Sequence, residues 1–156
     1  MIRFRKGRLH DIPAMQLLVA RQVEEGVILS RSDDEVATNI RSYTLAEDDG
    51  EIIGYGALHI HSPRLAEIRS LIVAEEYRGR SVGRGIVKAA LEEAKELGVQ
   101  EVLVLTYLPE FFEKLGFVEI AKESIPEHKI WADCIKCIHF PNCHEVSLIY
   151  AVPPEE

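Results

Sequence analysis

The stretch from Leu71 to Gly85 constrains the fold of this chain more than any other part. It runs from an apolar strand pattern through a loop rich in glycine and arginine into a long amphipathic helix. Glycines let a backbone come close to a ligand, and the first N–H groups of a helix have no partner within it, so they can point at bound phosphate. Arg78, Arg80 and Arg84 add positive charge. The stretch therefore favours an anion-binding turn, with a tight turn and solvated arginines as the alternative interpretation.

Strand and helix patterns follow one another along the whole chain. Strands are predicted at 2–5, 43–47, 51–60, 67–73, 102–105, 118–121 and 145–152, and helices at 11–24, 32–40, 83–97 and 109–115. Asp11 is expected to cap the first helix, Ser32 and Glu35 predict a capping box, and Asp49-Gly50 predicts a hairpin turn. No internal repeat or linker interrupts these patterns, so the sequence predicts one domain over residues 1–156.

The charge and the distribution of apolar residues exclude some classes of partner. The net charge is −8, and a negative surface repels polyphosphate, so we expect no nucleic acid as a partner. No apolar run approaches the roughly 20 residues needed to cross a bilayer, and the first residues lack the apolar segment of a signal peptide. We therefore expect no membrane partner and a cytoplasmic protein whose thiols stay reduced.

Two motifs resemble the GNAT superfamily of acetyltransferases. The residues from Arg78 to Gly83 are similar to its pyrophosphate loop, with Ser81 in place of the first glycine, and Phe111 to Phe117 resembles its second motif. A serine keeps its backbone N–H, so the loop is expected to work if the φ angle of Ser81 is negative. The resemblance implies the GNAT fold, an α/β (α+β) arrangement. Its central mixed, mostly antiparallel sheet is splayed at the fourth and fifth strands and carries helices on both faces.

The same resemblance implies acetyl-CoA as cosubstrate and a direct transfer of its acetyl group to an amine. The pantetheine arm would bond to backbone groups of Leu71, Ile72 and Val73 as if it were an added strand. A backbone N–H would polarise the acetyl carbonyl. The pyrophosphate would be held by Arg78, Gly79, Arg80, Ser81, Val82, Gly83 and Arg84.

Glu67 is the candidate general base. In many GNAT enzymes a carboxylate near the start of the fourth strand takes a proton from the acceptor ammonium, and Glu67 resembles that residue in position. The competing interpretation is an exposed strand glutamate paired with Arg64 or Arg69. Many family members have a tyrosine as general acid where this chain has Phe112. We expect water to protonate the leaving thiolate instead.

Three further segments suggest the acceptor. Residues 25–32, 66–71 and 126–134 resemble the acetyltransferase domain of N-acetylglutamate synthases, in particular short stand-alone ones. This resemblance implies an amino-acid N-acetyltransferase that acts on the α-amine of L-glutamate, early in arginine biosynthesis. Arg31, Arg69 and Lys129 lie in these segments and are the candidates for pairing with the two carboxylates of glutamate. Each of them is alternatively a solvated surface charge.

Other functions stay open at this point. The same class includes a GNAT enzyme for a different amino acid, a polyamine or a protein N-terminus. A different class is a non-catalytic acyl-CoA-binding or metal-binding module. A homodimer is also open, because the family often dimerises through its C-terminal strands.

Cys134, Cys137 and Cys143 fall close together, with His139 and His144 beside them. Their spacing suits a zinc site, a redox disulfide or three thiols that pack a loop. The sequence does not separate these alternatives, and we assign no metal ligand.

Overall fold

The computed structural model describes residues 1–26, 30–121, 124–125 and 146–154. Its contacts separate two compact units. The first comprises Met1–His59 and Ile68–Glu92, and the second comprises Ile60–Glu67 and Glu93–Glu156. The organisation as one domain stays a prediction.

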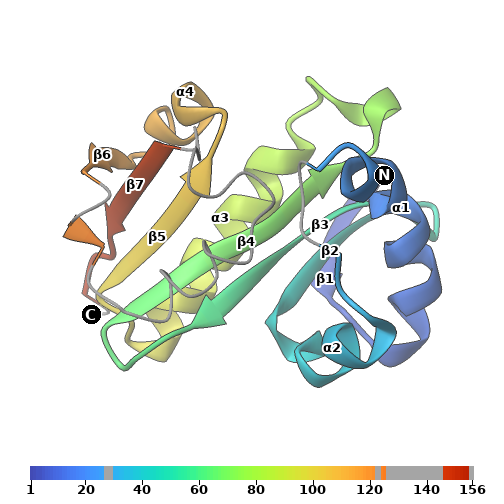
Figure 1. Ribbon diagram of the computed structural model, residues 1–156, viewed down its shortest axis with the longest axis horizontal. Coiled ribbons are helices and arrows are strands. Elements are labelled where there is room, and N and C mark those ends of the chain that lie inside the picture. The colour runs from blue at the N-terminus through green and yellow to red at the C-terminus, as the bar shows by residue number, and fades with distance from the viewer. Residues whose placement is uncertain (27–29, 122–123, 126–145, 155–156) are drawn as a thin grey trace. The chain divides into compact units, whose positions relative to one another are not determined.

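The first unit contains strands of a twisted sheet (Figure 1). They are β1 (Ile2–Lys6), β2 (Tyr43–Asp48), most of β3 (Glu51–Ile60) and most of β4 (Leu65–Val73). β1 pairs antiparallel with β2, and β2 pairs antiparallel with β3, where Tyr43 lies opposite Ala57. Between β2 and β3, Asp49 and Gly50 have φ angles of 51° and 86°. Two positive φ angles fit the type I′ turn of a two-residue hairpin, so the predicted hairpin is confirmed.

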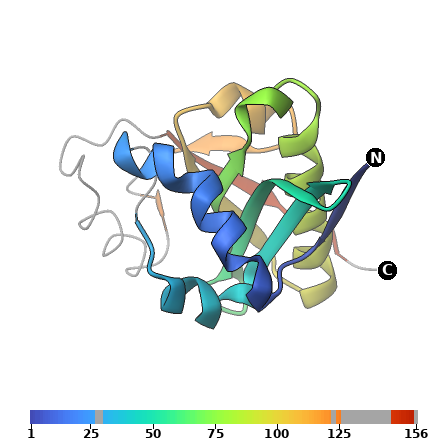
Figure 2. The same ribbon diagram turned by 90° about the vertical axis from the view of Figure 1, so that its right-hand side faces the viewer.

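Helices cover one face of these strands (Figures 1 and 2). They are α1 (Ile12–Glu24) and α2 (Asp33–Thr38), accompanied by the 3₁₀ turns η1 (Leu9–Asp11) and η2 (Ile40–Ser42). Their core with the sheet consists of Ile12, Met15, Val19, Val36, Tyr43, Leu45, Tyr55, Ala57 and Ile72. α2 begins with the predicted capping box: Oγ of Ser32 accepts from the Glu35 N–H at 3.1 Å, and Oε1 of Glu35 accepts from the Ser32 N–H at 3.2 Å.

The helix α3 (Val82–Leu97) begins in the first unit and packs on the other face of its strands. Ile86 belongs to a core cluster with Ala46, whereas the neighbouring Leu45 belongs to the α1 cluster. Successive side chains of a strand point to opposite faces, so helices lie on both faces here. Gly56 allows the close approach, because a Cβ at this position would lie 2.9 Å from Cγ2 of Ile86.

Asp11 does not cap α1 as predicted. Its carboxylate is buried and accepts two hydrogen bonds of 2.9 Å from the Arg5 guanidinium and one of 2.8 Å from the Arg8 N–H. Nε of Arg5 also donates to Oε2 of Glu47 at 3.1 Å. The Arg5 guanidinium holds the pKa of Asp11 below its ordinary value. This pair therefore joins β1 to the 3₁₀ turn that precedes α1.

The second unit contains the remaining elements. They are β5 (Glu101–Thr106), α4 (Pro109–Glu113), β6 (Val118–Ile120) and β7 (Val146–Ala151). β7 pairs antiparallel with both β5 and β6, so that Leu148 lies opposite Val104 on one side and Glu119 on the other. Phe112 is buried and stands edge-on to Phe117, with ring centroids 5.3 Å apart. The second aromatic motif of the sequence therefore packs α4 against the chain that follows it.

The described strands hydrogen-bond in the order β1-β2-β3-β4-β5-β7-β6. α3 follows β4 and precedes β5 in the chain, and the pairs β1–β2, β2–β3, β5–β7 and β6–β7 are antiparallel. The predicted α/β fold with a mixed, mostly antiparallel sheet and helices on both faces is confirmed. Its splay at the fourth and fifth strands stays a prediction. None of the described helices has the length and apolar character needed to cross a membrane.

Candidate active site

The chain from Arg78 to Arg84, which we call the anion-binding turn, leads from a 3₁₀ turn, η3 (Glu75–Tyr77), into α3. The backbone carbonyl of Ser81 accepts a hydrogen bond from the Gly85 N–H at 3.1 Å, so helical bonding starts at Ser81. The N–H groups of the first helical turn then point out of the helix end, where the partial positive charge is concentrated. This geometry suits a phosphate group.

Ser81 corrects one expectation about this turn. Its φ angle is 65°, close to the 79° of Gly79, and not negative as the sequence analysis required for a working loop. A left-handed conformation costs a residue with a Cβ about 1–2 kcal/mol relative to the usual backbone. Ser81 is exposed and keeps its N–H, so the turn retains a glycine-like backbone at the expense of local strain.

Two residues that the sequence analysis did not single out hold this turn. The Tyr77 hydroxyl donates to Oδ2 of Asp48 at 2.8 Å, and the Arg80 guanidinium lies 4.9 Å from the centre of the Tyr77 ring. The hydrogen bond raises the pKa of Tyr77 and lowers the pKa of Asp48. Arg78 and Arg84 are exposed. No local sequence pattern predicts this pair, because Asp48 precedes Tyr77 by 29 positions.

The strand β4 is interrupted directly before the predicted pantetheine-binding residues. Ser70 has a φ angle of 55° in the interior of the strand, which breaks its extended backbone. Leu71, Ile72 and Val73 follow and end β4. On the neighbouring strand, Gly54 allows a close approach, because a Cβ there would lie 2.9 Å from the Ile72 carbonyl oxygen. The three predicted residues thus stand between a backbone irregularity and the anion-binding turn.

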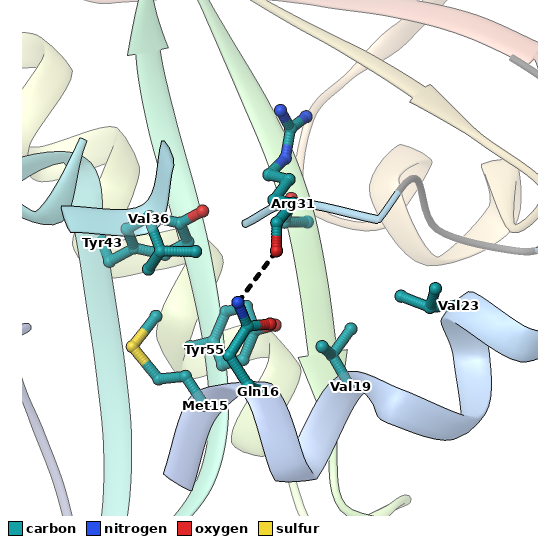
Figure 3. Close-up of a pocket in the computed structure, with 9 residues that line it drawn as sticks. Met15, Gln16, Val19, Val23, Arg31, Val36, Tyr43 and Tyr55 are labelled. Atoms are coloured by element: carbon teal, nitrogen blue, oxygen red, sulfur yellow. Dashed lines mark hydrogen bonds between the residues drawn. The ribbon is translucent and has the colours of Figure 1, made fainter. Parts of the chain in front are cut away.

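A pocket opens in the first unit beside α1 (Figure 3). It contains about 310 Å³ of space free of protein atoms, part of it open to solvent. Its lining consists of Met15, Gln16, Val19, Val23, Arg31, Val36, Tyr43, Tyr55 and Ser70. The rings of Tyr43 and Tyr55 meet edge to face with centroids 5.6 Å apart, and burial raises the pKa of both hydroxyls. The pocket thus combines an apolar wall with two neutral phenols.

Two of the three predicted substrate cations lie near one of these phenols. Burial has the largest effect on the Tyr43 pKa, and the charges of Arg31 and Arg69 both act against it, as does a hydrogen bond with Ser70. The Gln16 amide donates to the Arg31 carbonyl at 2.8 Å, while the Arg31 guanidinium points away from α1 (Figure 3). Both arginines are half-buried. Arg31 therefore lines the pocket, and the charge of Arg69, which is not among the lining residues, also acts on the Tyr43 hydroxyl.

Lys129, the third predicted cation, lies outside the described residues, as do the three cysteines and their neighbouring histidines. Their predicted roles stay predictions.

Glu67 is buried, which contradicts its interpretation as an exposed strand glutamate. Its Oε1 lies 2.7 Å from Nε2 of His61, and the side chains of the two residues are 8% and 1% exposed, respectively. The sequence analysis missed His61. The signal that points to it is its position six residues before Glu67, across the turn that joins β3 to β4.

Comparison with known proteins shows that most of the chain matches one protein family. Residues 9–117 match the model of the acetyltransferase (GNAT) family. An uncharacterized N-acetyltransferase of Chlorobaculum tepidum is 39% identical over 93% of both chains. An amino-acid acetyltransferase of Mycobacterium tuberculosis is 34% identical over 74% of this chain and 68% of its own length.

Solved structures agree on the fold. N-acetylglutamate synthase from Neisseria gonorrhoeae, solved with coenzyme A and N-acetyl-glutamate, has a TM-score of 0.88 at 21% identity. That match covers 98% of this chain and 35% of the synthase chain. A Mycobacterium tuberculosis protein in complex with CoA has a TM-score of 0.83 at 25% identity, with 97% of this chain and 99% of that chain covered.

Proposed function

The chain belongs to the GNAT family of acetyltransferases and is an N-acetyltransferase with acetyl-CoA as its cosubstrate, and we propose that it acetylates the α-amine of L-glutamate. The observation that carries the proposal is that Arg31 lines the pocket beside Tyr43, whose hydroxyl feels the charges of both Arg31 and Arg69. Relatives that are named amino-acid acetyltransferases support the same class of acceptor. Acetylation of glutamate would place the enzyme early in arginine biosynthesis.

Recognition of glutamate follows from the charges at the pocket. A free amino acid with two carboxylates requires two cationic or strongly donating groups, and guanidinium groups pair with carboxylates through two parallel hydrogen bonds. Arg31 and Arg69 are the two groups proposed for this role, and Lys129 is a third proposed partner. The hydroxyls of Tyr43 and Ser70 offer further donors. Half-burial of the arginines strengthens these pairs relative to fully solvated ones.

The cosubstrate would be held by backbone groups more than by side chains. Leu71, Ile72 and Val73 would bond the pantetheine arm beyond the break at Ser70. The anion-binding turn, from Arg78 to Arg84, would hold the pyrophosphate with its outward N–H groups and its arginines.

The transfer needs a neutral amine, since an ammonium has no lone pair. In the proposed step one N–H bond of the acceptor ammonium breaks and its proton passes to Glu67. The amine nitrogen then attacks the thioester carbon and a C–N bond forms. The C–S bond breaks, the sulfur leaves with its electron pair and takes a proton from solvent, and the nitrogen loses its second proton to solvent.

Substitution of the two arginines tests the acceptor. Arg31→Ala or Arg69→Ala should lower kcat/KM for glutamate roughly 10- to 150-fold, because each removes a charge-assisted pair worth ~1.5–3 kcal/mol. The KM for acetyl-CoA should stay near the wild-type value. Arg41→Ala, which removes an exposed arginine from η2, is the matched control. If kcat/KM for glutamate is unchanged in both Arg31→Ala and Arg69→Ala, these arginines do not bind the carboxylates of the substrate. The assignment as an acetyltransferase would still hold.

A further inference from the structure

The hydrogen bond between His61 and Glu67 joins two buried side chains of the β3–β4 hairpin. Nε2 of His61 lies 2.7 Å from Oε1 of Glu67. A carboxylate has only acceptors, so an ionised Glu67 requires the hydrogen to sit on Nε2 of His61. Whenever Glu67 is ionised, this contact is therefore a charge-assisted hydrogen bond, which is stronger than one between neutral groups.

The turn between these two residues is fixed by its own hydrogen bonds. The N–H groups of His61 and Ser62 donate to the Leu65 carbonyl at 3.0 and 3.2 Å. Oγ of Ser62 in turn accepts from the Arg64 N–H at 3.2 Å and from the Leu65 N–H at 3.1 Å. These bonds hold the backbone of the turn on which His61 lies, and Glu67 follows the turn on β4.

We propose that His61 is a positioning residue for the proton-transfer step. Its Nε2–H holds one oxygen of Glu67 and stabilises the ionised carboxylate in its buried position, because a buried charge without donors is strongly disfavoured. This inference rests on the proposed function, in which Glu67 is the general base. When an N–H bond of the acceptor ammonium breaks, an O–H bond forms on Glu67 and His61 keeps its own proton.

Two substitutions at His61 separate hydrogen bonding from packing. His61→Leu fills a similar volume without a donor and should lower kcat about 10- to 100-fold. The KM for acetyl-CoA should not change, since the cosubstrate does not contact this residue in the proposed scheme. His61→Gln places an amide N–H near the position of Nε2 and should restore most of the rate. His10→Leu, at a histidine whose side chain is 71% exposed, is the control and should leave the rate unchanged.

A double-mutant cycle tests whether His61 acts through Glu67. If it does, His61→Leu/Glu67→Gln should be no slower than Glu67→Gln alone, because the histidine has no base left to position. Losses that multiply would overturn the inference, as would a wild-type rate in His61→Leu or an equal loss in His61→Gln. Circular dichroism melts establish that each variant folds. If His61→Leu does not fold, the comparison of His61→Gln with His61→Asn, whose shorter side chain withdraws the donor, carries the same test.

The Glu67→Gln variant distinguishes this inference from the proposed function. A wild-type rate in Glu67→Gln would remove Glu67 as general base and the proposed chemistry with it. A slow Glu67→Gln beside a fast His61→Leu would overturn the role of His61 alone.

Discussion

The hydroxyl of Tyr77 donates a hydrogen bond across 2.8 Å to Oδ2 of Asp48. Tyr77 ends the 3₁₀ turn before the anion-binding turn, and Asp48 ends β2, so the bond fastens the loop to the β2–β3 hairpin. The ring of the same tyrosine lies 4.9 Å from the Arg80 guanidinium. One side chain therefore positions both the entrance of the anion-binding turn and one of its cations.

Removal of this hydroxyl should weaken cosubstrate binding. Tyr77→Phe keeps the ring beside Arg80 and loses only the hydrogen bond to Asp48. Without this bond the turn is less ordered before the ligand binds, so binding has to order it, which lowers the affinity. We expect the Kd for CoA, measured by titration calorimetry, to rise about 3- to 10-fold, in line with the loss of one partly solvent-exposed hydrogen bond. Tyr150→Phe, on β7, is the matched control. Equal CoA affinity in Tyr77→Phe and wild type would show that the turn needs no such anchor.

Replacement of Ser81 by glycine should stabilise the protein. The left-handed φ angle of 65° costs serine about 1–2 kcal/mol, while glycine gives back roughly 0.5–1 kcal/mol as extra freedom of the unfolded chain. The free energy of unfolding should thus rise by about 0.5–1 kcal/mol, with CoA affinity equal or tighter. Ser32→Gly, at a helix cap with φ of −70°, should instead destabilise by a few tenths of a kcal/mol. A lower unfolding midpoint for Ser81→Gly would contradict the strain at this position.

The ion pair between Arg5 and Asp11 should make a large contribution to stability. Arg5→Met leaves the Asp11 carboxylate buried without its two guanidinium donors, and we expect a loss of roughly 2–4 kcal/mol. Arg3→Met is the control on the same strand. The Arg3 side chain is 73% exposed and 4.0 Å from Glu47, a kind of pair worth at most about 1 kcal/mol. Urea unfolding at neutral pH measures the stability loss of each variant.

The same pair predicts a pH dependence. The pKa of Asp11 is lowered from its ordinary value of 3.8, chiefly by the hydrogen bond from Arg5. A lowered carboxyl pKa stabilises the folded state fully above the ordinary value, and the stabilisation is lost as pH falls through the folded pKa below it. The stability difference between wild type and Arg5→Met should therefore be largest near neutral pH and shrink as the pH falls towards 2. A stability difference between the two proteins that does not change with pH would show that it does not come from the ionised Asp11 carboxylate.

Features encoded by neighbouring residues could be predicted from the sequence. The Asp49-Gly50 turn and the capping box of Ser32 and Glu35 depend on residues within four positions, and both were confirmed. The loop that leads into α3 could be predicted for the same reason, because its glycines, its arginines and its helix start are contiguous, and its role in binding an anion stays a prediction.

Features that depend on residues far apart in the sequence could not be predicted from it. Asp11 resembles a helix cap in the sequence, yet it binds Arg5 because β1 brings that guanidinium beside it. The partner of Tyr77 lies in another hairpin, and the burial of Glu67 depends on the packing of the whole β3–β4 hairpin. The sequence placed Glu67 on a strand, as the structure does, but did not predict its contact with His61, and its role as general base stays a prediction.

Acceptor specificity tests the central claim most directly. Purified protein is supplied with acetyl-CoA and, one at a time, each of the twenty amino acids and a polyamine, and the initial rate of CoA thiol release is recorded. If Arg31 and Arg69 bind the two carboxylates of the acceptor, glutamate should give the highest kcat/KM. Glutamine, which lacks the second charge, should be poorer by roughly 10- to 150-fold. Turnover of glutamine, lysine or the polyamine as fast as that of glutamate would contradict the glutamate assignment.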